Sequence, residues 1–346
     1  MHPSGGRRFH ELDAFRGLAA LWVVLFHFLY RYGQLLPQPG GPTPPIPLLT
    51  SGTLPVFWFF IISGFVITWT IERSDTVGAF TLSRFSRLYP TYWAALGITF
   101  TLGVLNPLPF QHYTPPQLLW NITMVQEYFH VRDIDGAYWS LAVELLFYAY
   151  MALFLRTGLI RRLPTIALIW AGLSVLAHLA ADLGLNVPWR IQLFGLLQYI
   201  HFFAAGIAFY QLWQGRSQKV SAAVLILCFV SIALTYSLTE VIVCACGFGL
   251  FLLAIRGRLS WICNPVTLWF GAISYALYVS HEFTGYRVIS SLDSHGVPHF
   301  VSVALTILGV LTLATVLTQY VEQPAMRAIR RAGHPPSHRL APRLSP

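Results

Sequence analysis

Long apolar stretches alternate with short polar segments along almost the whole chain. A helix needs about 20 mostly apolar residues to cross a bilayer, and ten stretches approach or reach that length. They lie at residues 12–31, 53–71, 88–105, 137–155, 164–182, 191–213, 219–237, 239–255, 265–284 and 299–321. Because most connections between them are short, the pattern predicts an all-α integral membrane protein, a polytopic bundle of about ten transmembrane helices.

The overall composition supports the same class. Of the 346 residues, 55% are hydrophobic and only 10% are charged, which is too little polar surface for an ordinary soluble domain. The first apolar stretch lies too far from a cleavage site of small residues to be a removable signal peptide. We therefore expect it to be part of the fold.

The basic residues fall almost entirely into alternate loops. The net charge is +9, but this alternation is the positive-inside pattern of a membrane protein and not the basic patch of a nucleic-acid-binding protein. With the N-terminus in the cytoplasm, 17 of the 22 Lys and Arg residues lie inside and Arg16 lies within the membrane; the four outside are Arg31, Arg132, Arg190 and Arg287. An even number of spans returns the C-terminus to the cytoplasm, and we expect no nucleic-acid partner.

One membrane domain accounts for most of the chain. We expect a cytoplasmic N-terminal tail at residues 1–7, the membrane domain at 8–325, and a cytoplasmic, Pro- and Arg-rich disordered tail at 326–346. Two long Pro-containing loops are predicted outside, at 37–47 and 106–136. They are either solvated linkers or a rim that guides an acceptor molecule toward the bundle.

The four cysteines predict no metal site. Cys228, Cys244, Cys246 and Cys263 all lie in apolar segments or at their inner ends. Cys244 and Cys246 are two residues apart, so on a helix they point about 200° away from each other, which is a poor arrangement for metal ligands. We expect these side chains to be small apolar fillers.

Arg16 and His27 are the most informative polar residues of the first apolar stretch. They lie eleven residues apart, and eleven steps of about 100° bring a helix back to within roughly 20° of the same direction. A guanidinium and an imidazole buried on one stripe of a membrane helix cost on the order of a few kcal/mol. The stripe therefore indicates a functional site.

A set of titratable residues is predicted near the outer face. Counting along each span at 1.5 Å per residue places His27, Glu144 and His281 at one depth, and Ser274 and Tyr278 share a helix face with His281. Such groups are tolerated in a membrane when they face a common wet cavity. A histidine supported by a carboxylate or a second histidine is a general-base arrangement.

A different set is predicted at the inner face. Arg84 and Arg87 are three residues apart, so they share a helix face and present forks suited to phosphate oxygens. Ser63 and Gly64 lie in the middle of the second stretch, where small residues permit either close backbone approach or a narrow channel. A cytoplasmic donor with a phosphorylated head and a long thin arm, such as an acyl-coenzyme A, fits this line of residues.

Six motifs in a fixed order carry a resemblance to a known family. They are LDAFRGLAALWVVLFH, SGFVI, RFSRLYP, WSLAVE, SYALYVSH and VEQP. The chain resembles, over roughly residues 8–325, the membrane acyltransferase family 3, which comprises bacterial exopolysaccharide, O-antigen and nodulation-factor O-acetyltransferases. The resemblance implies a bundle of ten or eleven spans in the bacterial inner (cytoplasmic) membrane. It also implies acetyl-CoA as the donor and a saccharide or glycolipid hydroxyl at the outer face as the acceptor.

The resemblance also transfers residue roles. The family's essential Arg and His of the first span match Arg16 and His27, and its cytoplasmic arginine pair matches Arg84 and Arg87. Other motif positions of the family match Glu144, Tyr278, His281 and Glu322. We expect Arg84 and Arg87 to bind the phosphates of CoA, His27 to act as general base, and Glu144 or His281 to support it. Arg16 is expected to polarise the donor or to orient the pocket, and Asp13 to pair with Arg16.

Three functions remain open at this stage. The first is O-acetylation of a cell-surface or lipid-linked saccharide, completed in the bundle itself or by a separate extracytoplasmic partner. The second is acylation of a small molecule such as a macrolide. The third is a transporter or flippase, which predicts internal repeats and broken half-helices; neither is evident in the sequence.

Overall fold

The chain folds into a helical bundle in the computed structural model, which describes residues 9–36, 46 and 49–333. Within these ranges there are helices and connecting loops and no strands. The expected tail at residues 1–7, nearly all of the outer loop at 37–47 and the last part of the C-terminal tail lie outside the described residues. The predicted all-α membrane class is confirmed.

Fifteen α-helices make up the described bundle. They are α1 (His10–Phe26), α2 (Tyr32–Leu35), α3 (Thr53–Ile71), α4 (Val77–Leu105), α5 (Pro115–Ile122), α6 (Trp139–Thr157), α7 (Leu163–Asp182), α8 (Trp189–Phe194), α9 (Ile200–Trp213), α10 (Gln218–Thr235), α11 (Leu238–Ile255), α12 (Pro265–Ser280), α13 (Glu282–Ser294), α14 (His299–Leu317) and α15 (Gln323–Gly333). Two π-helical segments, His27–Arg31 and Thr318–Glu322, join α1 to α2 and α14 to α15.

Eight helical segments of the described chain are long and apolar enough to cross a membrane. They are His10–Leu35, Thr53–Ile71, Val77–Leu105, Gly136–Thr157, Leu159–Asp182, Gln218–Thr235, Leu238–Ile255 and His299–Ala332. They correspond to eight of the ten predicted stretches. The last segment continues through residues 326–333, so this part of the expected disordered tail is helical.

The other two predicted stretches are broken helices. The stretch at 191–213 divides into α8 and the 14-residue α9, and the stretch at 265–284 divides at His281 into the 16-residue α12 and α13. At 1.5 Å per residue neither α9 nor α12 reaches the roughly 30 Å of a hydrocarbon core. Most of α9 is buried within the protein, which is where a membrane protein tolerates an interrupted helix.

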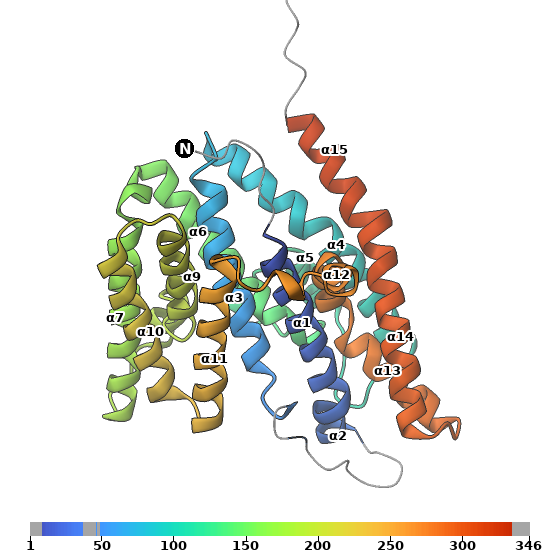
Figure 1. Ribbon diagram of the computed structural model, residues 1–346. Helices are drawn as coiled ribbons and strands as arrows, with labels where there is room; N and C mark the ends of the chain where they lie inside the picture. The colour runs from blue at the N-terminus through green and yellow to red at the C-terminus, as the bar shows by residue number, and fades with distance from the viewer. Residues whose placement is uncertain (1–8, 37–45, 47–48, 334–346) are drawn as a thin grey trace, which may run out of the picture.

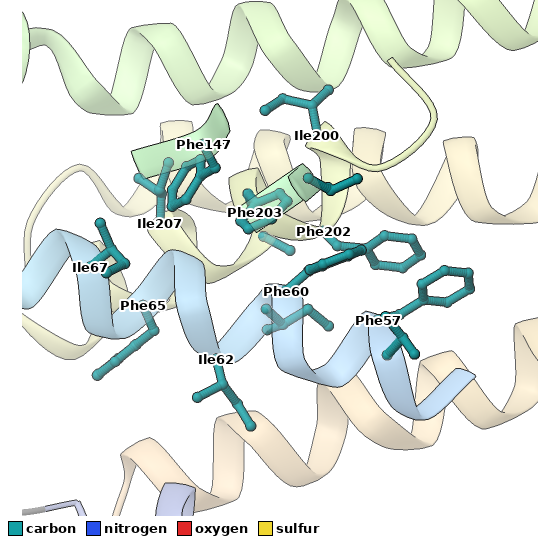
Figure 2. Packing of buried hydrophobic residues seen from close by; sticks show 14 of the residues in the cluster. Phe57, Phe60, Ile62, Phe65, Ile67, Phe147, Ile200, Phe202, Phe203 and Ile207 are labelled. Atoms are coloured by element: carbon teal, nitrogen blue, oxygen red, sulfur yellow. The ribbon is translucent and has the colours of Figure 1, made fainter. Parts of the chain in front are cut away.

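Aromatic packing between α3 and α9 forms the centre of the bundle (Figure 2). The Phe203 ring stacks on Phe60 of α3, with centroids 4.8 Å apart, and on Phe147 of α6 at 4.2 Å. Gly64 and Gly206 allow this approach, because a Cβ on Gly64 would collide with the Phe203 carbonyl. The small residue at position 64 therefore serves close helix packing.

A second pair of glycines brings α1 against α12. A Cβ on Gly17 would lie 2.5 Å from the backbone nitrogen of Gly271, so only glycine permits this contact. Figure 1 shows α1 and α12 side by side in the middle of the bundle, with α15 at the top and α2 at the bottom. We call the α15 side the inner side and the α2 side the outer side, following the orientation that the basic residues predict.

Candidate active site

His27 lies where the first long helix changes its winding. α1 ends at Phe26 and the chain continues as a π-helix from His27 to Arg31. A π-helical turn contains an extra residue, and such turns occur frequently at functional sites. The His27 side chain lines a cavity on the outer side of the bundle.

Hydrogen bonds fix which nitrogen of His27 carries the proton. Its Nδ1 lies 2.9 Å from the Val23 carbonyl, which only accepts, and 3.1 Å from Nε2 of His281. Nδ1 of His281 lies 2.8 Å from the Tyr278 carbonyl and must donate to it, so Nε2 of a neutral His281 is an acceptor. The hydrogen of His27 is thus on Nδ1, and Nε2 keeps the lone pair that a general base needs.

A carboxylate that the motif analysis missed lies beside this lone pair. Glu282 Oε2 is 3.3 Å from His27 Nε2, and no other described residue makes a hydrogen bond to that oxygen. Glu282 is only 5% exposed. Once His27 Nε2 has taken up a proton, its N–H can donate to Glu282, so this carboxylate would stabilise the imidazolium at the same nitrogen that acts as the base.

The chain around Glu282 is shaped to admit its carboxylate. A Cβ on Gly136 would lie 2.5 Å from Oε1 and 2.6 Å from Oε2 of Glu282. Asp135, which is fully buried, accepts hydrogen bonds from the backbone nitrogens of Ala137 and Phe283, at 3.2 and 3.0 Å. Asp135 thereby joins the start of the α6 span to the start of α13.

The break between α12 and α13 places His281 and Glu282 at the same corner. His281 is fully buried and touches His27 without lining the outer cavity, so it positions His27. Among the three functions left open by the sequence, broken half-helices were a prediction of the transporter. Here the broken helix instead supplies two neighbours of the candidate base.

The outer cavity is large and polar. Its volume is about 700 Å³. It is lined by His27, Arg31, Leu35, Thr53, Phe110, Glu127, His130, Val131, Arg132, Asp133, Gly136, Trp139, Glu282 and Phe283. Charged and hydrogen-bonding side chains predominate in this lining, which suits a hydrophilic molecule.

A second, narrower cavity lies deeper in the bundle, on the inner side of the outer one. Its volume is about 80 Å³, and Arg16, Ser63, Arg84, Glu144 and Tyr148 are among its lining residues. Glu144 accepts hydrogen bonds from the hydroxyls of Ser63 and Tyr148, both at 2.6 Å. The expectation that Glu144 shares the cavity of His27 is therefore wrong, because Glu144 faces the arginines and Glu282 takes the place beside His27.

Ser63 and Gly64, which the sequence predicted to border a donor molecule, have different surroundings. Ser63 lines the inner cavity, whereas Gly64 packs against α9 and does not line it. Arg16 also faces this cavity, and it lies 3.8 Å from Asp13, which confirms the expected pair.

Tyr278 and Ser140 stand between the two cavities. Both line the inner cavity, and their hydroxyl oxygens are 2.6 Å apart. Trp139, the neighbour of Ser140, lines the outer cavity, and the ring of Tyr278 is 6.0 Å from that of His281. The hydrogen-bonded pair thus lies between the inner cavity and the residues that surround His27.

The two arginines of RFSRLYP have different surroundings. Arg84 lines the inner cavity, and its buried Nε has no hydrogen-bond partner among the described residues. Arg87 forms an ion pair with Glu322 and lies over the Tyr275 ring, 5.9 Å from its centroid. Only Arg84 lines the inner cavity, because Glu322, at the end of the second π-helical segment, holds Arg87. That both arginines bind the phosphates of a donor stays a prediction.

The loop that covers the outer cavity contains a strongly perturbed carboxyl group. Burial, and next the neighbouring Glu127 carboxylate, raise the pKa of Asp133 to about 9. The amide nitrogen of Gln126 donates to Asp133 Oδ1 at 2.5 Å. At neutral pH, Asp133 is therefore a neutral acid in the cavity wall.

The chain is similar to known proteins that are named as acyltransferases. The chain is 25% identical to the acyltransferase MdmB of Streptomyces mycarofaciens, with 94% of this chain and 93% of that protein aligned. It is 26% identical to an O-acetyl transferase of Shigella phage Sf6, over 62% of this chain and 67% of that protein. Nodulation protein 10 of Rhizobium leguminosarum bv. viciae is 30% identical over 44% of this chain and 46% of its own length. No solved structure matches the chain significantly.

A family model described as an acyltransferase domain matches residues 9–319, nearly the whole described bundle. This range contains His27, Arg84, Glu144 and Glu282. The relatives and the family agree with the resemblance carried by the six motifs. The chain belongs to this acyltransferase family and is a multi-pass membrane enzyme.

Proposed function

We propose that the protein transfers acetyl from cytoplasmic acetyl-CoA to a hydroxyl of a cell-surface or lipid-linked saccharide in the bacterial inner membrane. The observation that carries this proposal is the lone pair of His27 Nε2, which borders a large polar cavity beside Glu282. Relatives named as O-acetyl transferase support the choice of acyl group and of oxygen as acceptor atom.

His27 activates the acceptor in this mechanism. Its Nε2 removes the proton of the sugar hydroxyl while the hydroxyl oxygen attacks the thioester carbonyl carbon. Glu282 stabilises the resulting imidazolium, and His281 keeps the ring oriented through Nδ1. When the carbon–sulfur bond breaks, the imidazolium returns its proton to the thiolate, so the products are the acetyl ester and CoA.

A two-step route uses the same nitrogen. His27 Nε2 can attack the thioester itself and pass the acetyl group to the acceptor afterwards. The two routes differ in one measurable way, because only the second leaves labelled acetyl on the protein when the donor is supplied without an acceptor.

The inner cavity binds the reactive end of the donor. Its volume of about 80 Å³ holds an acetyl thioester and no nucleotide, so the CoA phosphates stay on the inner side, where Arg84 and Arg87 lie. Arg84 keeps an unpartnered Nε for this purpose among the described residues, and Arg16 contributes positive charge nearby. The acetyl group, still bound to the CoA sulfur as a thioester, then passes the Ser140–Tyr278 pair to reach His27.

The outer cavity binds the acceptor. Its polar lining matches a molecule with many hydroxyl groups and fits an apolar acceptor poorly. Transfer is completed in the bundle, because the base and the acceptor cavity belong to the same chain. A separate extracytoplasmic partner would then act on the acetylated product or deliver the acceptor.

Transfer of labelled acetyl from acetyl-CoA to cell-envelope glycan tests the proposal. Membranes containing the intact protein, His27→Ala or Arg84→Ala are compared at equal protein abundance, with His10→Ala as a matched control on the exposed end of α1. We expect at least a 100-fold loss in the first two variants and normal transfer in the control. Unchanged transfer by His27→Ala, or transfer by the intact protein only to a small diffusible molecule, would contradict the proposal.

A further inference from the structure

The outer cavity does not end at the catalytic residues. It shares Glu127 and His130 with a neighbouring cavity of about 230 Å³. That cavity shares Gln192, Gln198 and Tyr199 with a third one of about 430 Å³. The three cavities form one series along the outer side, which we call the lateral groove.

The groove crosses a large part of the bundle. Its catalytic end is at α1 and α13, and its far end is lined by residues of α7 and α10, including His178 and Thr235. Figure 1 shows α7 and α10 at the left edge of the bundle and α13 at the right. Thr53, at the start of α3, lines both the catalytic cavity and the far one.

The far part of the groove combines neutral hydrogen-bonding side chains with aliphatic ones such as Leu185 and Val187. Asn186, Gln192 and Gln198 supply amide groups that both donate and accept hydrogen bonds. Trp189 and Tyr236 add aromatic faces, which pack against the carbon-bound hydrogens of a sugar ring. Apart from Glu127, which also lines the catalytic cavity, the described lining residues of these two cavities include no acidic residue and no Lys or Arg.

A hydrogen-bond chain holds His178 at the far end. Its Nδ1 lies 2.9 Å from the Ser231 hydroxyl, which is 3.0 Å from the Ser174 hydroxyl. Ser174 donates to the Leu197 carbonyl at 2.8 Å, so Ser231 donates to Ser174 and His178 Nδ1 donates to Ser231. This direction leaves His178 Nε2 as a fixed acceptor for a hydroxyl group.

We propose that the acceptor is an extended saccharide chain and that the lateral groove binds the sugar units beyond the one that is acetylated. This inference rests on the proposed function and names its substrate more closely. The absence of Lys and Arg from the lining beyond the catalytic cavity disfavours a phosphorylated or nucleotide-linked segment in this part of the groove. Asn186, Gln198 and His178 then determine the preference for long acceptors.

The test uses the full-length protein in detergent, saturating labelled acetyl-CoA, and fragments of the envelope polysaccharide of the expressing cells. The fragments are separated by size into one- to two-unit and six- to eight-unit fractions. The measured quantity is kcat/KM for long fragments divided by kcat/KM for short ones. We compare the intact protein with the double variant Asn186→Ala and Gln198→Ala, with His178→Ala, and with Gln218→Ala, an exposed amide at the start of α10 outside the groove.

We expect this ratio to fall about ten-fold in the double variant, several-fold in His178→Ala, and not at all in Gln218→Ala. An intact protein that acetylates short and long fragments equally well would overturn the inference and leave the proposed function standing. A ratio that stays constant in both groove variants would also overturn it. If the intact protein acetylates no fraction, the proposed function itself fails.

Discussion

The two cavities of this enzyme differ in how their polar groups are held. In the outer cavity, His27 and Glu282 come from a π-helical turn and from a break between two helices. In the inner cavity, Arg16, Arg84 and Glu144 come from the uninterrupted helices α1, α4 and α6. The regular helices hold a narrow site that contains two arginines and a glutamate, whereas the irregular backbone positions the base at a wide opening. In the proposed function, the inner cavity binds the donor and the outer cavity carries out proton transfer.

A substitution at Arg87 tests whether its ion pair with Glu322 stabilises the fold. Arg87→Ala leaves Glu322 buried without its partner, because Glu322 is 2% exposed and its second oxygen has no hydrogen-bond partner in the described chain. Removing one member of a buried pair costs about 3–5 kcal/mol. Thermal unfolding in detergent should therefore show a large loss, with Arg327→Ala on the exposed face of α15 as the control. Equal stability of the two variants would contradict the structural role.

A substitution at Glu282 tests whether the outer cavity acts in proton transfer and not in donor binding. Glu282→Gln keeps the shape of the side chain but removes the charge that stabilises the imidazolium of His27. We expect kcat to fall about 30-fold, corresponding to about 2 kcal/mol, with KM for acetyl-CoA unchanged. Steady-state kinetics with saturating acceptor measure both constants, and Glu11→Gln at the inner end of α1 is the control. A raised KM for the donor would show that Glu282 belongs with the donor site instead.

Gly136 tests whether the position of that carboxylate matters. Gly136→Ala places a methyl group 2.5 Å from Glu282 Oε1, so the carboxylate has to move away from His27. We expect kcat to fall several-fold and stability by about 1–3 kcal/mol. Gly97→Ala is a matched control, because a Cβ at Gly97 in α4 meets no atom within 4 Å. Identical kinetics for the two variants would contradict the claim that the position of the Glu282 carboxylate matters for catalysis.

Asp133 gives a test of the cavity wall through the pH dependence of stability. Its pKa rises from the ordinary value of 3.8 to about 9 on folding, so between these values the native state binds more protons than the unfolded state. Raising the pH through this window therefore lowers stability. Asp133→Asn cannot titrate, and its Tm should decline less from pH 5 to pH 9 than that of the intact protein. Parallel Tm curves would show that Asp133 titrates normally.

The sequence predicted the regular parts of this molecule well. Eight of the ten apolar stretches are span-long helices, because hydropathy and helix length are local properties of the chain. Arg16 and His27, predicted to share one stripe, line two different cavities of the bundle, and their functional role stays a prediction.

The missed features all depend on interrupted helices or on contacts between distant segments. The apolar run through residue 284 concealed the break at His281, so Glu282, which directly follows the SYALYVSH motif, fell inside a predicted span and received no role. Counting depth along ideal helices placed Glu144 with His27, whereas its contacts with Ser63 and Tyr148 place it with the arginines. The pairing of Arg87 with Glu322, 235 residues later, has no local signal.

Donor binding by inactive variants tests the division between the cavities most directly. Equilibrium binding of acetyl-CoA is measured for the intact protein, His27→Ala and Arg84→Ala in detergent, with proper folding checked by thermal unfolding. The account predicts that His27→Ala binds the donor with an unchanged Kd although it transfers no acetyl, and that Arg84→Ala raises the Kd at least ten-fold. Loss of donor binding in His27→Ala, or normal binding in Arg84→Ala, would contradict it.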